Sequence, residues 1–201
     1  MPTDRGGQPL CLLTIHAHPD DESSKGAGAV ARYAAEGVHT VLVCCTGGEE
    51  GDILNPAMDI PEVRDNLADV RRRELEAAAK IIGYDEVVLL GYRDSGMPDT
   101  PANSDPRSFW AADAGEAIGR LVAIIRRARP QVVVTYPEDQ QGYPHPDHLK
   151  VHDVTFPAVD AAADPDAYPD AGPHRRHARE VPRARPRIAL RRRLVRTPIE
   201  R

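Results

Sequence analysis

Two short clusters of histidine and acidic residues stand out in this chain of 201 residues. The first is His18-Pro19-Asp20-Asp21-Glu22 near the N-terminus, and the second is His145-Pro146-Asp147-His148, far along the chain. Imidazole nitrogens and carboxylate oxygens together suit Zn²⁺, and Fe²⁺ accepts the same ligands. Acidic groups that do not bind the ion are available to move protons. The two clusters together therefore favour a metal-dependent hydrolase.

The spacing within the clusters suggests which residues bind the metal. His18 and Asp21 are three residues apart, and Pro19 restricts the turn between them, so both can reach one ion. His148 can supply a third ligand from the second cluster. Three protein ligands leave a fourth position for water, as is typical of a catalytic zinc site, and bound Zn²⁺ lowers the pKa of that water to about 7. We therefore expect His18, Asp21 and His148 to be the metal ligands.

The other members of the clusters are suited to proton transfer and support. Asp20 lies beside the ligands without being needed as one, so it is placed to take the proton of the water. His145 can stabilise an oxyanion or protonate a departing amine, and Asp147 can orient one of the histidines. Each cluster alone also fits a turn before an acidic helix start. The hydrolase hypothesis depends on their joint occurrence.

The elements that would position these residues follow an alternating pattern. Short, continuous apolar runs, typical of strands buried on both faces, cover residues 10–15, 39–45, 86–90 and 131–136. Helical patterns cover residues 24–36, 61–82, 109–129 and 149–162. The alternation predicts an α/β fold, Rossmann-like and three-layered, with a mostly parallel sheet. Because ligands bind beyond the carboxyl ends of such strands, the clusters are expected to meet there.

The composition is that of an ordinary globular protein, with 41% hydrophobic and 28% charged residues. No apolar stretch approaches the roughly 20 residues of a membrane span, and the first residues lack the apolar middle of a secretory signal. Cys11, Cys44 and Cys45 lie in apolar runs, so we expect three buried, reduced thiols. These features predict a cytoplasmic protein that does not bind membranes.

The last thirty residues differ sharply from the rest. Residues 172–201 contain eleven Arg, two Glu and four Pro, whereas residues 1–171 contain 15 basic and 29 acidic residues. A disordered tail, a basic arm for nucleic acid, and an altered reading frame or truncated gene all remain open. The acidic body and the lack of a nucleic-acid motif argue against nucleic-acid binding. We expect residues 1–171 to form the hydrolase domain and residues 172–201 to be a disordered or non-native tail.

Several motifs resemble those of a known family. Ala17-His18-Pro19-Asp20-Asp21-Glu22 and Gly142-Tyr143-Pro144-His145-Pro146-Asp147-His148 resemble the two signatures of the PIG-L/LmbE-like zinc deacetylases. The resemblance covers roughly residues 9–171. Within the family, residues 16–26 and 46–56 are most similar to the amidases that act on mycothiol S-conjugates. The related deacetylases of the mycothiol pathway come next.

The resemblance implies roles for individual residues. His18, Asp21 and His148 match the zinc ligands of the family, Asp20 matches the general base, and His145 matches the oxyanion-stabilising histidine.

Residues outside the ligand set are implied to contact the substrate. Tyr143 matches a mobile tyrosine near the scissile amide, and Lys25 matches a lysine that faces the cysteinyl side of a conjugate. Glu49, Arg71 and Asp94 match positions that grip the glucosaminyl-inositol part. Simpler interpretations remain: Arg71 and Lys25 can be solvated helix residues, and Glu49 and Asp94 can cap loops.

The expected activity is therefore that of a zinc-dependent amidase. It would cleave the amide of a mycothiol S-conjugate, a small pseudodisaccharide thiol, to a mercapturic acid and glucosaminyl-inositol in a detoxification step. The alternative in the same chemistry removes acetate from N-acetylglucosaminyl-inositol. A non-catalytic binding protein and a decayed hydrolase that keeps its metal are further alternatives. Family members continue well beyond the length of this chain.

Overall fold

A single parallel sheet forms the centre of the molecule. The computed structural model describes residues 1–140, 142–172 and 187–190. Within them the strands are β1 (Cys11–His16), β2 (His39–Thr46), β3 (Glu86–Tyr92), β4 (Val132–Thr135) and β5 (Arg187–Leu190). All neighbouring strands pair in parallel, in the order β3-β2-β1-β4-β5. This arrangement confirms the predicted α/β fold.

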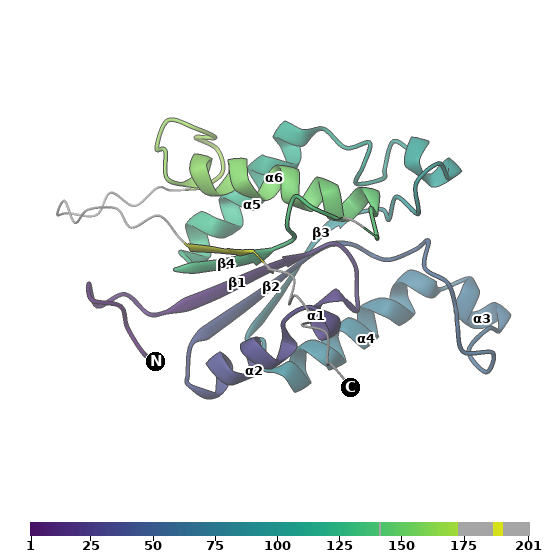
Figure 1. Cartoon of the computed structure of the whole chain (residues 1–201), viewed down its shortest axis with the longest axis horizontal. Coiled ribbons are helices and arrows are strands. Elements are labelled where there is room, and N and C mark those ends of the chain that lie inside the picture. Colours follow the sequence, from purple (N-terminus) through teal and green to yellow (C-terminus); the bar gives the residue numbers. More distant parts are fainter. Residues whose placement is uncertain (141, 173–186, 191–201) are drawn as a thin grey trace, which may run out of the picture.

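Helices cover both faces of the sheet, which gives the expected three layers (Figure 1). One layer holds α1 (Asp21–Ser24), α2 (Ala27–Ala35), α3 (Pro61–Arg64) and α4 (Leu67–Ile82). The other holds α5 (Ala114–Ala128) and α6 (Pro146–Ala162). A short 3₁₀-helix, η1 (Pro101–Ser104), lies in the connection after β3.

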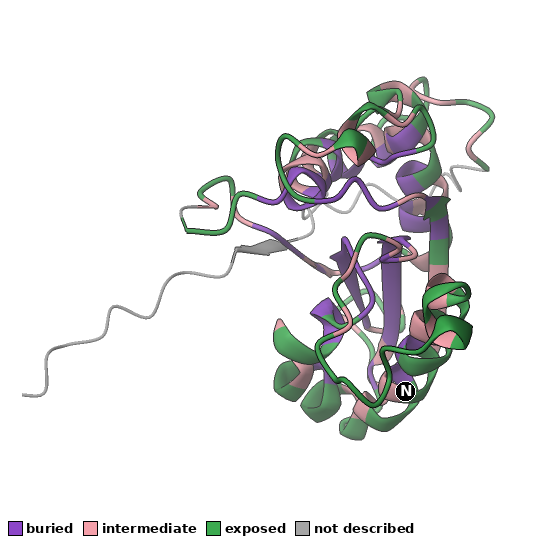
Figure 2. Ribbon diagram, turned by 90° about the vertical axis from the view of Figure 1, so that its right-hand side faces the viewer, coloured by how far each residue is buried: buried purple, intermediate pink, exposed green. Residues whose placement is uncertain are grey.

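The two central strands, β1 and β2, are mostly apolar because both of their faces are buried, whereas β3 at one edge of the sheet is partly exposed. Successive side chains of a strand point to opposite faces, so Leu13 and Ile15 pack with the α5 and α6 layer. Leu12 instead packs with the α2 and α4 layer, against Val30 and Leu75. Figure 2 shows the strands and the inner helix surfaces buried, with the outer helix surfaces exposed. Burying one such leucine stabilises the fold by about 1.5–3 kcal/mol.

All four predicted helices have different bounds in the structure, and three of them differ as follows. The helix predicted over 24–36 is two helices, α1 and α2, separated at Gly26, whose φ of 105° is in the left-handed region that glycine tolerates. The helix predicted over 61–82 is interrupted at residues 65–66, between α3 and α4. The helix predicted from residue 109 begins at Ala114, because Asp113 caps it by accepting a hydrogen bond from the Glu116 N–H (2.8 Å).

Helix α6 begins at Pro146, three residues before its predicted start. The His145 side chain caps it, because its Nδ1 accepts a hydrogen bond from the Asp147 N–H (3.2 Å). Pro146 is well suited to the first helical position, where its missing N–H is not needed. Asp147 and His148 therefore lie in the first turn of a helix, which limits the positions their side chains can take.

Most of the arginine-rich segment lies outside the described residues, so the expected disordered or non-native tail of residues 172–201 stays a prediction. Residues 187–190 are described and form β5, an element that the sequence did not predict. Among the helices that the structure describes, none combines the length and the apolar character needed to cross a bilayer. Cys11, Cys44 and Cys45 are buried and free, as predicted.

Candidate metal centre

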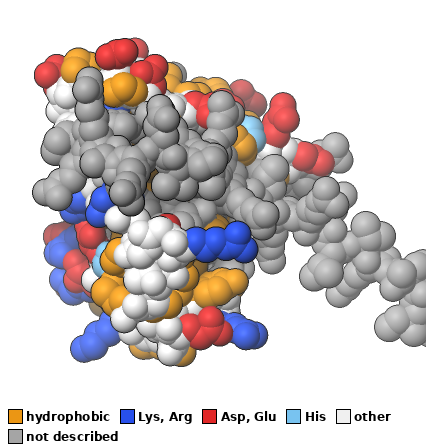
Figure 3. Space-filling model, turned by 90° about the vertical axis from the view of Figure 1, so that its left-hand side faces the viewer, with side chains coloured by type: hydrophobic (Ala, Val, Ile, Leu, Met, Phe, Trp, Pro, Cys, Tyr) orange, Lys and Arg blue, Asp and Glu red, His pale blue; other side chains and the backbone are white. Residues whose placement is uncertain are grey.

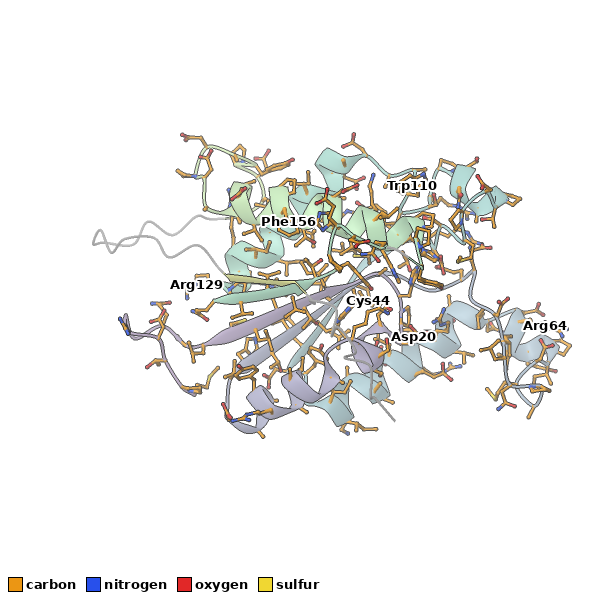
Figure 4. The ribbon with its side chains drawn as sticks, viewed as in Figure 1. Asp20, Cys44, Arg64, Trp110, Arg129 and Phe156 are labelled. Atoms are coloured by element: carbon orange, nitrogen blue, oxygen red, sulfur yellow. The ribbon has the colours of Figure 1, made fainter. Side chains whose placement is uncertain are left out.

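The candidate site lies where the order in which strands are added to the sheet reverses. The chain passes from β1 outward to β3 and then returns to place β4 on the other side of β1. Parallel sheets bind ligands at this switch point, beyond the carboxyl ends of the strands. Asp20 follows β1 and lies at that end in Figure 4, whereas Arg129, which precedes β4, lies at the opposite end. Figure 3 faces the opposite end, where hydrophobic side chains lie among charged groups of both signs.

The three predicted ligands converge at this point, and all three are buried. Asp21 Oδ2 lies 3.6 Å from His18 Nδ1 and 3.5 Å from His148 Nε2. The three ligand atoms lie within 4.8 Å of one another. Ligands held about 2.0–2.1 Å from a tetrahedral zinc ion lie about 3.3 Å apart. The donor types and their separations therefore fit one zinc ion.

The other nitrogen of His18 is already used. Its Nε2 lies 3.2 Å from Asp147 Oδ2, and an ionised carboxylate only accepts hydrogen bonds, so Nε2 carries the proton. The Nδ1 lone pair is then free for a metal. His18, Asp94, His145 and Asp147 form a second group of possible ligands, which shares His18. A neutral imidazole has a single lone pair, so this geometry favours one ion on the Nδ1 side.

The charge of the centre also favours a cation. Asp21, Asp94 and Asp147 are all buried within reach of His18. Burial lowers the pKa of His18, but its hydrogen bond with Asp147 and the nearby Asp21 and Asp94 carboxylates outweigh that effect and raise the pKa well above 6.5. A bound divalent cation would replace the extra proton.

Asp21 is held in its ionised form by several donors. Its Oδ2 accepts hydrogen bonds from the Tyr136 hydroxyl and from the His18 N–H (3.1 Å), and its Oδ1 contacts the Lys25 ammonium. Burial alone would raise the pKa of Asp21, but the contacts with His148, His18 and Lys25 hold it far below its usual range. The Tyr136 ring also stacks on His148, with ring centres 4.4 Å apart.

His145 presents a hydrogen-bond donor to the site. Its Nδ1 accepts from the Asp147 N–H, so the proton of the neutral ring is on Nε2. That Nε2 lies 4.0 Å from Asp94 Oδ1, which is too far for a hydrogen bond. Burial and the nearby charge of His18 lower the pKa of His145 to about 4. The ring is therefore neutral near pH 7 and its N–H remains available.

Asp20 is not among the ligands, and Arg71 holds its carboxylate. Asp20 has a left-handed backbone, with φ of 103°, and its side chain is 73% exposed. Partial desolvation and the Asp21 charge raise its pKa, and Arg71 opposes this change. Arg71 donates to Asp20 Oδ2 (2.9 Å), to the Pro19 carbonyl (2.6 Å) and to the Gly48 carbonyl (2.9 Å). Its side chain is only 16% exposed, so it joins two loops instead of lying on a solvated helix face.

The residues expected to contact substrate are placed differently from one another. Tyr143 is 55% exposed, and its ring centre lies 5.6 Å from that of His148, so it borders the centre. Glu49 Oε2 accepts from the Asp94 N–H (2.9 Å). Asp94 is buried, and Lys25 contacts Asp21. The contacts of Glu49 and Lys25 are with the protein itself, and their roles toward substrate stay predictions.

Two residues that contact the centre were missed in the sequence. Tyr136 donates to Asp21, and Ser95 donates to Asp147. Tyr136 is the last residue of the strand predicted over 131–136, and Ser95 follows the strand predicted over 86–90; this placement near a strand end is the local signal of their position. A lone hydroxyl after a strand is too common to indicate such a role.

Comparison with known proteins identifies the family. The sequence profile of PIG-L, described as GlcNAc-PI de-N-acetylase, matches residues 13–159. The chain belongs to the PIG-L family. The match includes both histidine clusters, so it confirms the resemblance that those motifs indicated.

This PIG-L chain matches only about half the length of its curated relatives. A protein of Geodermatophilus obscurus named 1D-myo-inositol 2-acetamido-2-deoxy-alpha-D-glucopyranoside deacetylase is 51% identical over 160 residues, which cover 77% of this chain and 54% of that protein. The chain thus spans about half the length of the curated relatives it matches. The name describes the deacetylation that the sequence analysis kept as its alternative. It gives no support to the expected S-conjugate amidase.

Solved structures share the fold. The N,N'-diacetylchitobiose deacetylase of Pyrococcus horikoshii has a TM-score of 0.64 at 24% identity, over 80% of this chain and 53% of its own. The 4-carboxy-2-hydroxymuconate hydratase GalB of Pseudomonas putida KT2440 has a TM-score of 0.60 at 24% identity, over 80% of this chain and 59% of its own. Because one fold accommodates a deacetylase and a hydratase, the reaction must be argued from the site.

Proposed function

We propose that this PIG-L chain carries the catalytic centre of a zinc-dependent deacetylase. The proposed substrate is N-acetylglucosaminyl-inositol, and the products are acetate and the free amine. The observation that carries the proposal is the convergence of His18, Asp21 and His148, from two segments far apart in sequence, at separations suited to one ion. The 51% identity to a relative named for this deacetylation supports the choice of substrate.

His18 Nδ1, Asp21 Oδ2 and His148 Nε2 would hold the metal. When bound, Zn²⁺ supplies a Lewis acid that lowers the pKa of a coordinated water and polarises the amide carbonyl. Asp147 keeps His18 in the tautomer that leaves Nδ1 unprotonated, because its Oδ2 accepts from Nε2. Tyr136 and Lys25 neutralise part of the Asp21 charge and fix its orientation.

Asp20 is the proposed base. Its side chain is exposed, and the hydrogen bond from Arg71 to Oδ2 restricts its orientation. It would take a proton from water as the water oxygen attacks the carbonyl carbon. The proton then passes to the amide nitrogen as the C–N bond breaks, which leaves acetate and the amine.

His145 is the proposed donor to the oxygen of the scissile amide. A neutral ring with its proton on Nε2 can donate to the negative charge that develops on that oxygen. Tyr143 would close over the same group from the rim. Glu49 uses Oε2 for the Asp94 N–H, so Oε1 can accept from a sugar hydroxyl. Arg71 and Asp94 would complete the sugar contacts from the loops they brace.

The substrate is tested by comparing two hydrolysis rates. The zinc-loaded chain is given N-acetylglucosaminyl-inositol in one assay and a mycothiol S-conjugate in the other, with acetate and mercapturic acid as the measured products. We expect the larger kcat/KM for acetate release, which a chelator abolishes and added zinc restores. Faster conjugate cleavage would contradict the proposal in favour of the amidase. Zinc binding without either activity would favour the decayed hydrolase.

A further inference from the structure

The loop after β3 reaches the metal centre through one buried serine. The Ser95 N–H donates to Asp147 Oδ2 (3.0 Å), and the Ser95 hydroxyl donates to Asp147 Oδ1. One residue thus holds both oxygens of a carboxylate that lies 52 positions further along the chain. Both side chains are fully buried, so water cannot replace these bonds without rearrangement.

The carboxylate held by Ser95 is the one that contacts His18. Asp147 Oδ2 lies 3.2 Å from His18 Nε2. A carboxylate bound at both oxygens cannot rotate freely, so its lone pair stays directed at the imidazole N–H. This bond in turn directs His18 Nδ1 toward the metal position. Partners that orient a metal-binding histidine in this way tune metal affinity.

Ser95 is itself fixed in place by its neighbours. The Trp110 N–H donates to Ser95 Oγ (2.8 Å), so the hydroxyl proton is left for Asp147. The Asn103 side-chain amide donates to the carbonyls of Ser95 and Met97, which folds the loop back on itself. Phe109, beside Trp110, is fully buried and anchors this segment in the core.

From this chain of contacts we infer that Ser95 is a positioning residue for the metal centre. It sets the affinity for zinc by holding Asp147 against His18. The inference rests on the metal site of the proposed function, but it needs no particular substrate. A serine that only packed the loop would affect stability without acting through Asp147.

A double-mutant cycle on zinc affinity separates these two roles. The dissociation constant of the full chain for Zn²⁺ is measured by competition with a chromophoric chelator. We expect Ser95→Ala to weaken binding about 10- to 100-fold, as found for groups that orient metal-binding histidines. Asp147→Ala should weaken it at least as much. The double variant should bind no more weakly than Asp147→Ala alone, because Ser95 acts through Asp147.

Ser108→Ala is the matched control. Ser108 is equally buried, and its hydroxyl accepts from the Ala111 N–H (3.2 Å) on the turn beside Trp110. This variant should keep the wild-type zinc affinity, even if it loses some stability.

Two results would overturn the inference. One is wild-type zinc affinity in Ser95→Ala, and the other is an undiminished effect of Ser95→Ala in the Asp147→Ala background. If Ser95→Ala does not fold, Ser95→Cys keeps the shape but donates more weakly, and the same loss of affinity is expected. Wild-type affinity in Ser95→Cys would contradict the inference. The expected coupling together with no hydrolysis of either substrate would leave the inference standing and refute the proposed function.

Discussion

An aspartate lies beside each ring nitrogen of His18, and the two aspartates contact the ring in different ways. On the Nδ1 side, Asp21 Oδ2 lies 3.6 Å from His18 Nδ1 and 3.5 Å from His148 Nε2. These separations are long for hydrogen bonds but suited to a shared ion. On the Nε2 side, Asp147 is hydrogen-bonded to His18 at 3.2 Å and held by Ser95. Asp94 Oδ1 also lies 3.6 Å from Nε2, so spacing alone does not separate the two sides. The Asp147 hydrogen bond at Nε2 leaves Nδ1 for the ion, and on this ground we propose that Asp21 binds the metal and Asp147 supports His18.

The largest effect is expected on the Nδ1 side. His148→Ala removes one of the three proposed ligands, so we expect zinc content to fall from one ion per chain to nearly none and hydrolysis to be lost. Metal analysis of the dialysed protein gives the answer. His39→Ala is the control, because His39 pairs with Asp85 away from the centre (3.3 Å) and should leave zinc content unchanged. Full zinc content in His148→Ala would remove that residue from the ligand set.

A large effect on rate alone is expected from Asp20. Asp20→Asn removes the proposed base and no ligand, so kcat should fall about 10²- to 10⁴-fold while zinc affinity stays close to wild type. Asp69→Asn on the exposed surface of α4 is the control for the same chemical change. Unchanged turnover in Asp20→Asn would refute the assignment of the base.

A smaller effect is expected on the Nε2 side. Asp147→Asn keeps the shape of the side chain but removes its charge, so His18 loses a charged acceptor. We expect zinc affinity to fall about 10- to 100-fold, less than in His148→Ala. If both variants lost zinc equally, Asp147 would be a ligand and the contrast between the two sides would fail.

The hydrogen bonds of Arg71 with Asp20, Pro19 and Gly48 lead us to expect an effect on stability. Gly48 has φ of 70°, and a Cβ there would lie 2.2 Å from Arg71 Nη1. Gly48→Ala should lower the free energy of unfolding by about 1–3 kcal/mol, measured by urea denaturation. Gly28→Ala is the control, because a Cβ at this position of α2 meets no atom within 4 Å. Equal stability of the two variants would contradict the left-handed backbone of Gly48 and the close approach of Arg71 to it.

The smallest expected effect is on the reactivity of the three cysteines, which are buried and are not among the groups around His18. Burial, followed by the charges of Glu86 and Asp85, raises the pKa of Cys11 to about 11, and burial also raises the pKa values of Cys44 and Cys45.

The folded chain should therefore not react with a thiol reagent at about pH 8 until urea unfolds it. Because the folded state keeps the thiol proton more tightly than the unfolded state, stability should fall as the pH rises above 9.0, the ordinary value for the Cys11 thiol. Rapid labelling of the folded chain would contradict the burial of these residues.

The parts of the fold with a strong local signal were predictable. Strand β2 is apolar from Val41 to Cys45, where both faces are buried, and this pattern was visible in residues 39–45. Helix starts were less predictable, because they depend on caps. His145 was expected only to act on substrate, yet its ring also caps α6 and moves the start of that helix to Pro146.

The site residues also divide into those with a local sequence signal and those without one. The residues of the two clusters could be proposed as ligands because each cluster is local and has a characteristic spacing. Ser95 and Tyr136 could not, because their bonds to Asp147 and Asp21 join residues 52 and 115 positions apart. The inward position of Arg71 was also hidden, since its neighbours in the run Arg71-Arg72-Arg73 carry the same charge.

X-ray absorption at the zinc edge tests the central claim most directly, because it reports the atoms around the ion in the loaded chain. The account predicts one zinc per chain with two imidazoles and oxygen ligands at about 2.0–2.2 Å, and the loss of one imidazole from any zinc retained by His148→Ala. A sulfur ligand at about 2.3 Å, or a single imidazole in the wild-type chain, would contradict the convergence of the two clusters on one ion.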